Sequence, residues 1–202
     1  MRIIAGLAKG RTLSRVAGAT RPTSDRAREG LFSSLLSEFG DFTALKVLDL
    51  FAGSGAIGLE ALSRGAGLVH AVEKNDGACK TITKNAALVV RAKTLGEFHL
   101  FSMSAQKFLE ILPTAQYDIV YLDPPYDFSD VELYKCLVQL RTAQFLQEDA
   151  VIAVERASKT GAMKWPSGFE SIRERKYGTA VIYYGKLAQN GLDPQSLLAF
   201  DP

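Results

Sequence analysis

The sequence predicts an α/β fold with a doubly wound, mainly parallel seven-stranded sheet. Five short apolar runs alternate with helical patterns between residues 46 and 154, which is typical of a parallel sheet with helices on both faces. A glycine-rich turn follows the first of these runs, and an acidic residue closes the second. Two more strand-like runs follow with no room for a crossover helix between them, so we expect a C-terminal antiparallel hairpin.

Composition is that of a globular domain without a membrane segment. The chain has 202 residues, of which 47% are hydrophobic and 23% charged. No apolar run approaches the 18 or so residues of a membrane span, and the first residues lack the apolar core of a signal peptide, so we expect a cytoplasmic protein. Cys79 and Cys136 belong to no metal-binding pattern, so neither a metal site nor a disulfide is expected.

The N-terminal region is basic. Residues 1–30 contain seven basic and two acidic side chains, a local charge of +5, so the rest of the chain carries −3 of the total charge of +2. Glycines at 6, 10 and 18 favour a small hairpin or extended arm, and a helix is expected from Thr23–Asp25 to Phe39. We expect a basic N-terminal arm with its helix at 1–40 packed on a main domain at 41–187, and a mobile tail at 188–202. A basic arm on a slightly acidic body favours contact with a nucleic acid, although a solvated Arg-rich terminus is the simpler alternative.

The first expected strand, Lys46–Phe51, leads through residues 52–58 into a helix that continues as Leu59–Arg64. Glycines let the backbone turn tightly and approach a ligand, and the start of a helix offers free N–H groups. Such a turn often serves only packing. Here Asp49 precedes it, and Glu73, which closes the strand Leu68–Val72, can accept hydrogen bonds from ribose hydroxyls. The arrangement therefore predicts a site for a nucleoside cofactor.

The remaining elements follow in regular order. Beyond a helix at 75–90 and a strand at Glu97–Met103, Ser104 either caps the next helix or contacts the adenine amino group of the cofactor. The further expected elements are a helix at Ala105–Leu112, a strand at Tyr117–Leu122, a helix at Val131–Leu146, a strand at Ala150–Val154, an irregular connection at 157–169, and hairpin strands at Ser171–Tyr177 and Thr179–Leu187.

The motif Asp123-Pro124-Pro125-Tyr126 follows a buried strand, at the sheet edge where open α/β sheets bind their ligands. Each proline fixes its own backbone and restricts the residue before it, so the carbonyl groups of Asp123 and Pro124 are held in set directions. A carboxylate and a rigid carbonyl can accept both hydrogens of a planar amino group while Tyr126 stacks on its ring. The residues alone therefore predict an acceptor site for an aromatic or amide amino group.

Together these motifs resemble a known family. The segment from Asp49 to Gly55, Glu73 and the motif at 123–126 resemble class I S-adenosylmethionine-dependent methyltransferases that modify exocyclic amino groups. More narrowly, the chain is similar to the RsmD-type enzymes, which methylate guanine N2 in small-subunit (16S) ribosomal RNA. This similarity rests on residues 1–6, 9–11, 21–26, 58–66 and Tyr177-Gly178-Thr179, and runs from Met1 to about Leu187.

The resemblance implies a role for each group of residues. The expected catalytic residues are Asp123, Pro124, Pro125 and Tyr126. The expected cofactor-binding residues are Asp49, Phe51, Ala52, Gly53, Ser54, Gly55, Glu73, Lys74, Ser104 and Asp123. The expected RNA-binding residues are Arg2, Lys9, Arg11, Arg21, Thr23, Arg26 and Arg28.

The resemblance also implies the reaction and its partners. S-adenosylmethionine would be the cofactor, S-adenosylhomocysteine the product, and no metal would take part. The partner would be small-subunit ribosomal RNA, naked or within a ribosomal particle, bound by a monomer. The alternatives are an amino-methyltransferase for DNA adenine or protein glutamine, an NAD-dependent oxidoreductase, and a non-catalytic ribosome-assembly factor.

Overall fold

The structure is a computed structural model that describes residues 1–16 and 25–188. Its helices are α1 (Asp25–Phe39), α2 (Ala56–Ser63), α3 (Asp76–Val90), α4 (Ala105–Leu109) and α5 (Asp130–Thr142). Its strands are β1 (Lys46–Asp49), β2 (Leu68–Glu73), β3 (Glu97–Ser102), β4 (Tyr117–Leu122), β5 (Leu146–Ala157), β6 (Phe169–Tyr177) and β7 (Ala180–Leu187).

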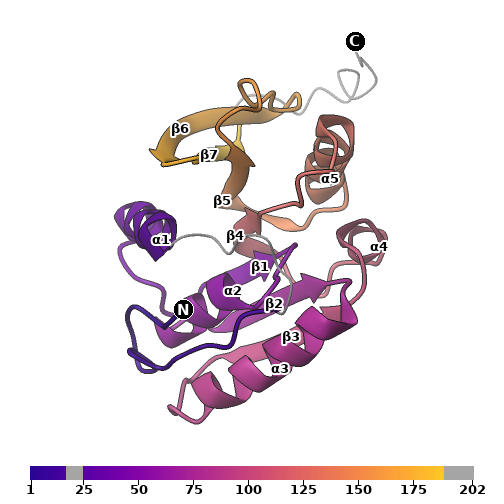
Figure 1. The fold of residues 1–202 in the computed structure, drawn as a ribbon. Coiled ribbons are helices and arrows are strands. Elements are labelled where there is room, and N and C mark those ends of the chain that lie inside the picture. The colour runs from indigo at the N-terminus through magenta and orange to yellow at the C-terminus, as the bar shows by residue number, and fades with distance from the viewer. Residues whose placement is uncertain (17–24, 189–202) are drawn as a thin grey trace.

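In the described part of the chain, the strands form one seven-stranded sheet in the order β3-β2-β1-β4-β5-β7-β6 (Figure 1). The first five strands in this order are parallel, and β7 pairs antiparallel with both β5 and β6. The predicted fold class, including the C-terminal antiparallel hairpin, is confirmed. An antiparallel strand inserted at this place is absent from the 3-2-1-4-5-6 parallel sheet of dinucleotide-binding oxidoreductases.

Both faces of the central strands of the sheet are buried, whereas β3 and β6 at its edges are partly exposed. On one face, side chains of α1, α2 and the N-terminal segment pack with inward-facing residues such as Leu31, Leu59 and Ile119. On the other face, α4 and α5 cover Val120 and its neighbours. Burial on both sides explains why β4 reads as a nearly continuous apolar run rather than an alternating one.

The end of α5 differs from the sequence prediction. The helix begins at a capping box in which Ser129 and Glu132 satisfy each other's backbone N–H groups. It ends at Thr142, not at Leu146, because Gln144 takes a left-handed conformation with φ of 60°. The next residue, Phe145, accepts a hydrogen bond of 2.8 Å from the N–H of Tyr117, so the following apolar residues join the sheet as β5. The helix α4 is also shorter than expected and ends at Leu109.

The N-terminal segment folds back on itself and is packed into the core. A single antiparallel bridge joins Arg2 and Thr12, and the N–H of Ile3 donates to the carbonyl of Arg11 at 2.9 Å. Ile3 and Leu13 are 1% and 2% exposed, so their side chains belong to the core that covers α2. These residues anchor the segment to the sheet domain.

Within the described ranges, no helix has the length and apolar character that crossing a membrane requires. In the same ranges, no three His, Cys, Asp or Glu side chains gather closely enough to hold a metal ion.

Candidate active site

The glycine turn joins β1 to α2 at the carboxyl end of the sheet. Gly53 and Gly55 have φ of 55° and 77°, a region that glycine enters without a steric penalty. A Cβ on Gly53 would meet no atom of the described residues within 4 Å, whereas one on Gly55 would lie 3.3 Å from the side chains of Ile82 and Leu59. The turn is therefore open at Gly53, where a ligand can approach the backbone, and closed by packing at Gly55.

Glu73, at the end of β2, is bound to this turn. One carboxylate oxygen accepts the N–H of Gly53 at 2.8 Å, and the other accepts the N–H of Asn75 at 2.8 Å. These two bonds fix the carboxylate beside the turn, and each oxygen keeps further acceptor capacity. The predicted contact with ribose hydroxyls fits this geometry and stays a prediction. Lys74, the next predicted residue, is exposed.

Asp49, the last residue of β1, lies beneath the start of α2 and is 1% exposed. No N–H or O–H of the described residues reaches either carboxylate oxygen with hydrogen-bond geometry. Burial raises the pKa of Asp49 to about 7, the charge of Glu73 adds to the rise, and the nearby N–H groups of Gly58 and Phe51 oppose it. A buried carboxylate without a partner is suited to a ligand that brings a positive charge.

The motif at 123–126 lies beside this turn, because β4 and β1 are neighbours. The N–H of Leu50 donates to the carbonyl of Tyr121 at 3.0 Å, just before the two chains separate. Asp123 is half-buried, whereas Tyr126 is 71% exposed, so its ring is available for stacking.

The chain after this motif folds back toward the turn. The N–H of Phe128 donates to the carbonyl of Pro125 at 2.9 Å, and the ring of Phe128 meets that of Phe51 edge-on at 5.1 Å. The predicted cofactor turn and the predicted acceptor motif are thus brought together at one edge of the sheet. Phe128 was not predicted, because a single aromatic residue after a proline-rich turn carries no signal of its own.

Ser104 caps α4. Its hydroxyl oxygen accepts the N–H of Lys107 at 3.2 Å. Of the two alternatives drawn from the sequence, the capping role is therefore present, and contact with the adenine amino group stays a prediction.

A second carboxylate lies on β5, in the region next to Asp123. Glu155 is 7% exposed and accepts a hydrogen bond of 2.6 Å from the hydroxyl of Tyr121. Val154 pairs with Leu122, so Glu155 and Asp123 follow neighbouring positions of adjacent strands. Glu155 and Asp123 become neighbours because β4 and β5 pair in the sheet. The apolar run of either strand alone does not indicate this proximity.

The predicted RNA-binding residues separate into exposed and buried ones. Arg2, Lys9, Arg11 and Arg26 are exposed. Arg21 and Thr23 lie outside the described residues.

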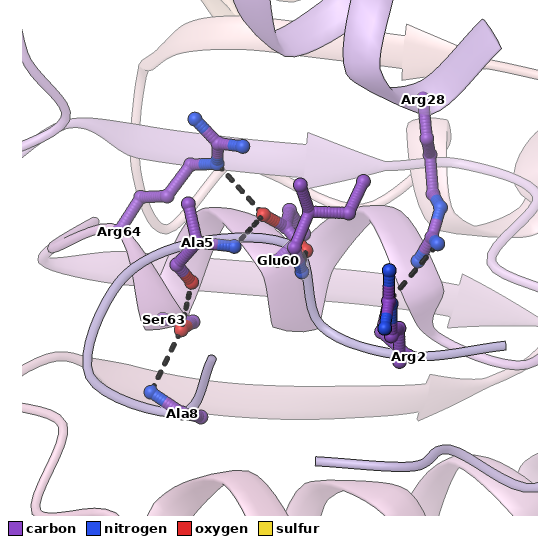
Figure 2. A network of polar contacts seen from close by, with 8 residues as sticks. Arg2, Ala5, Ala8, Arg28, Glu60, Ser63 and Arg64 are labelled. Carbon is purple, nitrogen blue, oxygen red and sulfur yellow. Dashed lines mark hydrogen bonds and ion pairs between the residues drawn. The ribbon is translucent and has the colours of Figure 1, made fainter. Parts of the chain in front are cut away.

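The prediction that Arg28 contacts phosphate groups is wrong for this structure, since Arg28 is 0% exposed. Its Nη2 donates to Asp25 at 2.6 Å. The same nitrogen donates to the carbonyl of Arg2 at 3.0 Å (Figure 2). The helical spacing of Asp25 and Arg28 brings the two charges together, and the N-terminal segment covers Arg28, whereas the side chain of Asp25 stays exposed. Arg28 therefore joins α1 to the N-terminal segment.

The N-terminal segment is held along α2 by two polar side chains that the sequence did not single out. Glu60 is fully buried and accepts the N–H groups of Ile4 and Ala5 at 2.7 and 3.0 Å (Figure 2). Ser63, one turn later, accepts the N–H of Ala8 at 2.9 Å and donates to the carbonyl of Ala5 at 2.6 Å. A charged residue inside the otherwise apolar stretch of α2 was the available signal for Glu60.

The segment then returns to the glycine turn between β1 and α2. The amide of Asn85, which is fully buried in α3, accepts the N–H of Ser14 at 2.8 Å and donates to the carbonyl of Ser14 at 3.0 Å. The same amide donates to the carbonyl of Ser54 at 2.9 Å, inside the glycine turn. Nothing in the local sequence marks Asn85, because polar residues are common on helices.

This path decides where the basic side chains lie. The tip of the segment, which carries Lys9, packs against the last turn of α2, whereas Ser14 lies at the glycine turn before the first turn of α2. An eight-residue helix is about 12 Å long, so Lys9 is separated from the glycine turn by roughly the length of α2.

Comparison with known proteins agrees with this architecture. The family model described as Conserved hypothetical protein 95 matches residues 1–186. Ribosomal RNA small subunit methyltransferase D of Escherichia coli K12 is 33% identical over 195 residues, 96% of this chain and 93% of that protein. The protein of the same name from Haemophilus influenzae is 33% identical over 193 residues, 94% of each chain.

A solved structure is similar over nearly the same length. The structure of yhhF from Escherichia coli has a TM-score of 0.79 and 30% identity, and the match covers 93% of this chain and 97% of that one. The residues matched by the family model include the glycine turn, the motif at 123–126 and nearly all of the C-terminal hairpin, and the chain therefore belongs to the RsmD family.

Proposed function

We propose that this protein transfers the methyl group of S-adenosylmethionine to the exocyclic N2 amino group of a guanine in small-subunit ribosomal RNA. The observation that carries the proposal is the meeting of the glycine turn and the motif at 123–126 at the carboxyl ends of β1 and β4. The relatives named above are ribosomal RNA methyltransferases by name, which supports the reaction and the class of substrate. The choice of guanine N2 follows from the family resemblance.

The residues around the turn fit the cofactor. Gly53 leaves open space beside the backbone, and the partnerless carboxylate of Asp49 suits the cationic part of the ligand. Glu73 is held where it can accept bonds from the ribose hydroxyls. Phe51, Ala52, Ser54, Gly55 and Lys74 complete the turn, with Ser104 at the end of β3. When bound, S-adenosylmethionine supplies an electrophilic methyl group on a sulfonium centre.

The acceptor residues localise the lone pair of the amine. The exocyclic nitrogen of guanine is a poor nucleophile because its lone pair is delocalised into the ring. If the carboxylate of Asp123 and the carbonyl of Pro124 accept its two N–H bonds, the nitrogen becomes more tetrahedral and its lone pair points away from the ring.

Tyr126 stacks on the base, which has to leave its helix or loop to enter the site. The N–CH₃ bond then forms as the S–CH₃ bond breaks. The methylated amine is cationic and acidic, so its proton passes to Asp123 or water without a strong general base.

The setting of the reaction is part of the same proposal. Exposed Arg2, Lys9, Arg11 and Arg26 provide sequence-independent attraction to phosphate groups. Both cysteines, Cys79 and Cys136, are free and buried, as in proteins of the reducing cytoplasm. We infer a cytoplasmic monomer that acts on ribosomal RNA, naked or in a ribosomal particle.

A methyl-transfer assay with naked small-subunit RNA, assembled small subunits and DNA tests the proposal. We expect transfer to one of the two RNA substrates, with N2-methylguanine found after digestion to nucleosides. Methylated adenine in DNA, methylated glutamine in protein, or no transfer to any substrate would refute it, and these outcomes correspond to the alternative methyltransferases and to an assembly factor. Calorimetry with S-adenosylhomocysteine and with NAD separates the oxidoreductase alternative.

The role of Asp123 is tested in the same assay. Asp123→Ala should lower turnover by about 100-fold or more, since it removes an acceptor aimed at the reacting amine. The glycine turn and Glu73 remain, so most of the cofactor affinity measured by calorimetry should be retained. Asp127→Ala is the matched control, because Asp127 is an exposed acid in the same loop. If Asp123→Ala turned over like the control, Asp123 would have no part in the reaction.

A further inference from the structure

The turn between β6 and β7, which contains Tyr177-Gly178-Thr179, lies at the same edge of the sheet as the acceptor motif. Ala157 at the end of β5 pairs with Ala180, and the N–H of Ser158 donates to the carbonyl of Thr179 at 2.8 Å. The strands β4, β5 and β7 are neighbours in this order, so the turn lies two strand spacings from Asp123 across the sheet. Along β7, it lies about three residues beyond the position level with Asp123. Standard sheet dimensions place it about 14 Å from Asp123.

Helix α1 lies beside β6 in antiparallel register. A Cβ on Gly30 would overlap the Tyr177 ring and hydroxyl, and Arg173 bonds Glu38 at 2.7 Å. Gly30 and Glu38 are about 12 Å apart along the helix, and Tyr177 and Arg173 are about 13 Å apart along the strand. The two elements therefore stay side by side over this length. Arg26 is one helical turn before Gly30, which places it about 6 Å beyond Tyr177, level with the turn.

Four exposed cations therefore surround this turn, from three parts of the chain. We name them the hairpin surface: Arg26, Lys159, Arg175 and Lys176. Side chains alternate between the two faces of a strand, so Arg175 lies on the same face as Arg173 and Tyr177, which face α1. Lys176 points to the opposite face of the sheet. Lys159 follows Ser158, whose backbone is bonded to the turn.

The acidic residues nearby are engaged or directed elsewhere. Asp25 is paired with Arg28, and Glu38 with Arg173. Glu29 lines a hollow together with Arg2 and Lys9. The side chain of Glu174 points to the opposite face of the sheet from Arg175. Burial raises the pKa of Tyr183, and the charge of Glu174 adds to the rise. Among residues 1–16 and 25–188, no ion pair involves any member of the hairpin surface.

We propose that the hairpin surface binds phosphate groups of the RNA that flanks the target nucleotide. This inference rests on the proposed function, since it assigns a second binding region to the same substrate. Arginines at the substrate edge of a sheet that form no ion pair with a described residue suit a polyanion, because guanidinium groups bind phosphate in fork geometry. With the N-terminal segment on α2 and the hairpin surface beyond α1, the RNA would be held on both sides of the acceptor motif.

A pair of charge-removing variants tests this inference. The Arg26→Gln/Arg175→Gln double variant should weaken binding of naked small-subunit RNA by about tenfold or more, since the loss of even one charged hydrogen bond to phosphate weakens binding by about that factor. The slope of log K against log salt should fall by about 0.7 to 0.9 for each phosphate group that the variant no longer neutralises. Cofactor affinity, measured by calorimetry with S-adenosylhomocysteine, should stay at the wild-type value.

Lys84→Gln/Arg91→Gln is the matched control, because both residues are exposed on α3 or directly after it, and it should bind RNA like the wild type. Arg26→Lys/Arg175→Lys keeps the charges and should recover most of the affinity and the salt slope. If the Gln double variant matched this control in affinity and slope, the hairpin surface would not bind RNA. Failure of the wild type to methylate any RNA would instead contradict the proposed function.

Discussion

Asp49 combines full burial with an ionisable side chain, and its position predicts a pH dependence of stability. Its pKa rises from 3.8 to about 7 in the folded protein, mainly through burial. The folded state therefore holds a proton that the unfolded state has released, and the stability contribution of the neutral form is present below pH 4 and lost as the pH rises through about 7.

Asp49→Asn keeps the shape and removes the charge. We expect it to raise the melting temperature of the ligand-free protein at pH 8, with a smaller gain at pH 5, as measured by scanning calorimetry. The shift corresponds to about 4 kcal/mol of free energy of unfolding at most, at about 1.4 kcal/mol for each pKa unit. An equal gain at both pH values would show that Asp49 is not the titrating group.

At the scale of the elements, we expect helix α3 to hold the glycine turn in place through Asn85, which donates to the carbonyl of Ser54. Asn85→Ala leaves the carbonyl of Ser54 and both backbone groups of Ser14 without their partner. We expect the free energy of unfolding to fall by about 2 to 3 kcal/mol, since the variant removes all three of these hydrogen bonds, and cofactor affinity to fall as well. Calorimetric titration with S-adenosylhomocysteine well below the melting temperature separates the two effects.

Thr83→Ala on the same helix is the control, because the hydroxyl of Thr83 donates within α3, to the carbonyl of Cys79. An Asn85→Ala protein that bound the ligand like this control would show that the tie to Ser54 does not position the turn.

The packing of α1 on β6 predicts that Gly30→Ala destabilises the protein, whereas helix propensity alone predicts that it stabilises it. Alanine is a better helix former than glycine by about 1 kcal/mol, yet a methyl group on Gly30 would overlap Tyr177. We expect Gly30→Ala to lower the free energy of unfolding in urea by about 1 to 3 kcal/mol through overpacking. Ser33→Ala, at an exposed position of α1, should be neutral or stabilising, and adding Tyr177→Ala should relieve the overlap in Gly30→Ala. Stabilisation by Gly30→Ala would contradict the packing.

At the scale of the whole molecule, the N-terminal segment and the sheet are expected to unfold together. The N–H of Ile4 donates to the buried carboxylate of Glu60, and that of Ala8 to Ser63. Hydrogen exchange should therefore show amide protection at these two positions close to that of β1, because their exchange requires global opening. Exchange at Gly161, an exposed loop residue, should be fast and serves as the reference. Rapid exchange of Ile4 and Ala8 would instead describe a free arm.

Most of the fold could be predicted because local patterns carry it. Continuous apolar runs marked the buried strands, and the absence of a crossover helix marked the hairpin. The end of α5 could not be predicted, because the residues after Thr142 have acceptable helical character and only pairing of Phe145 with Tyr117 draws them into the sheet. The left-handed backbone of Gln144 follows from that pairing.

For the candidate site, the sequence by itself determined the glycine turn, the acid at the end of β2 and the proline-rich motif at 123–126. These features are local: a few neighbouring residues define the backbone and the chemistry. The tertiary structure alone decided the burial of Arg28, the anchoring of the basic segment by Glu60 and Asn85, and the position of the hairpin surface. Each of these depends on interactions between residues distant in the chain, and side-chain type does not reveal whether a charge meets solvent or a buried partner.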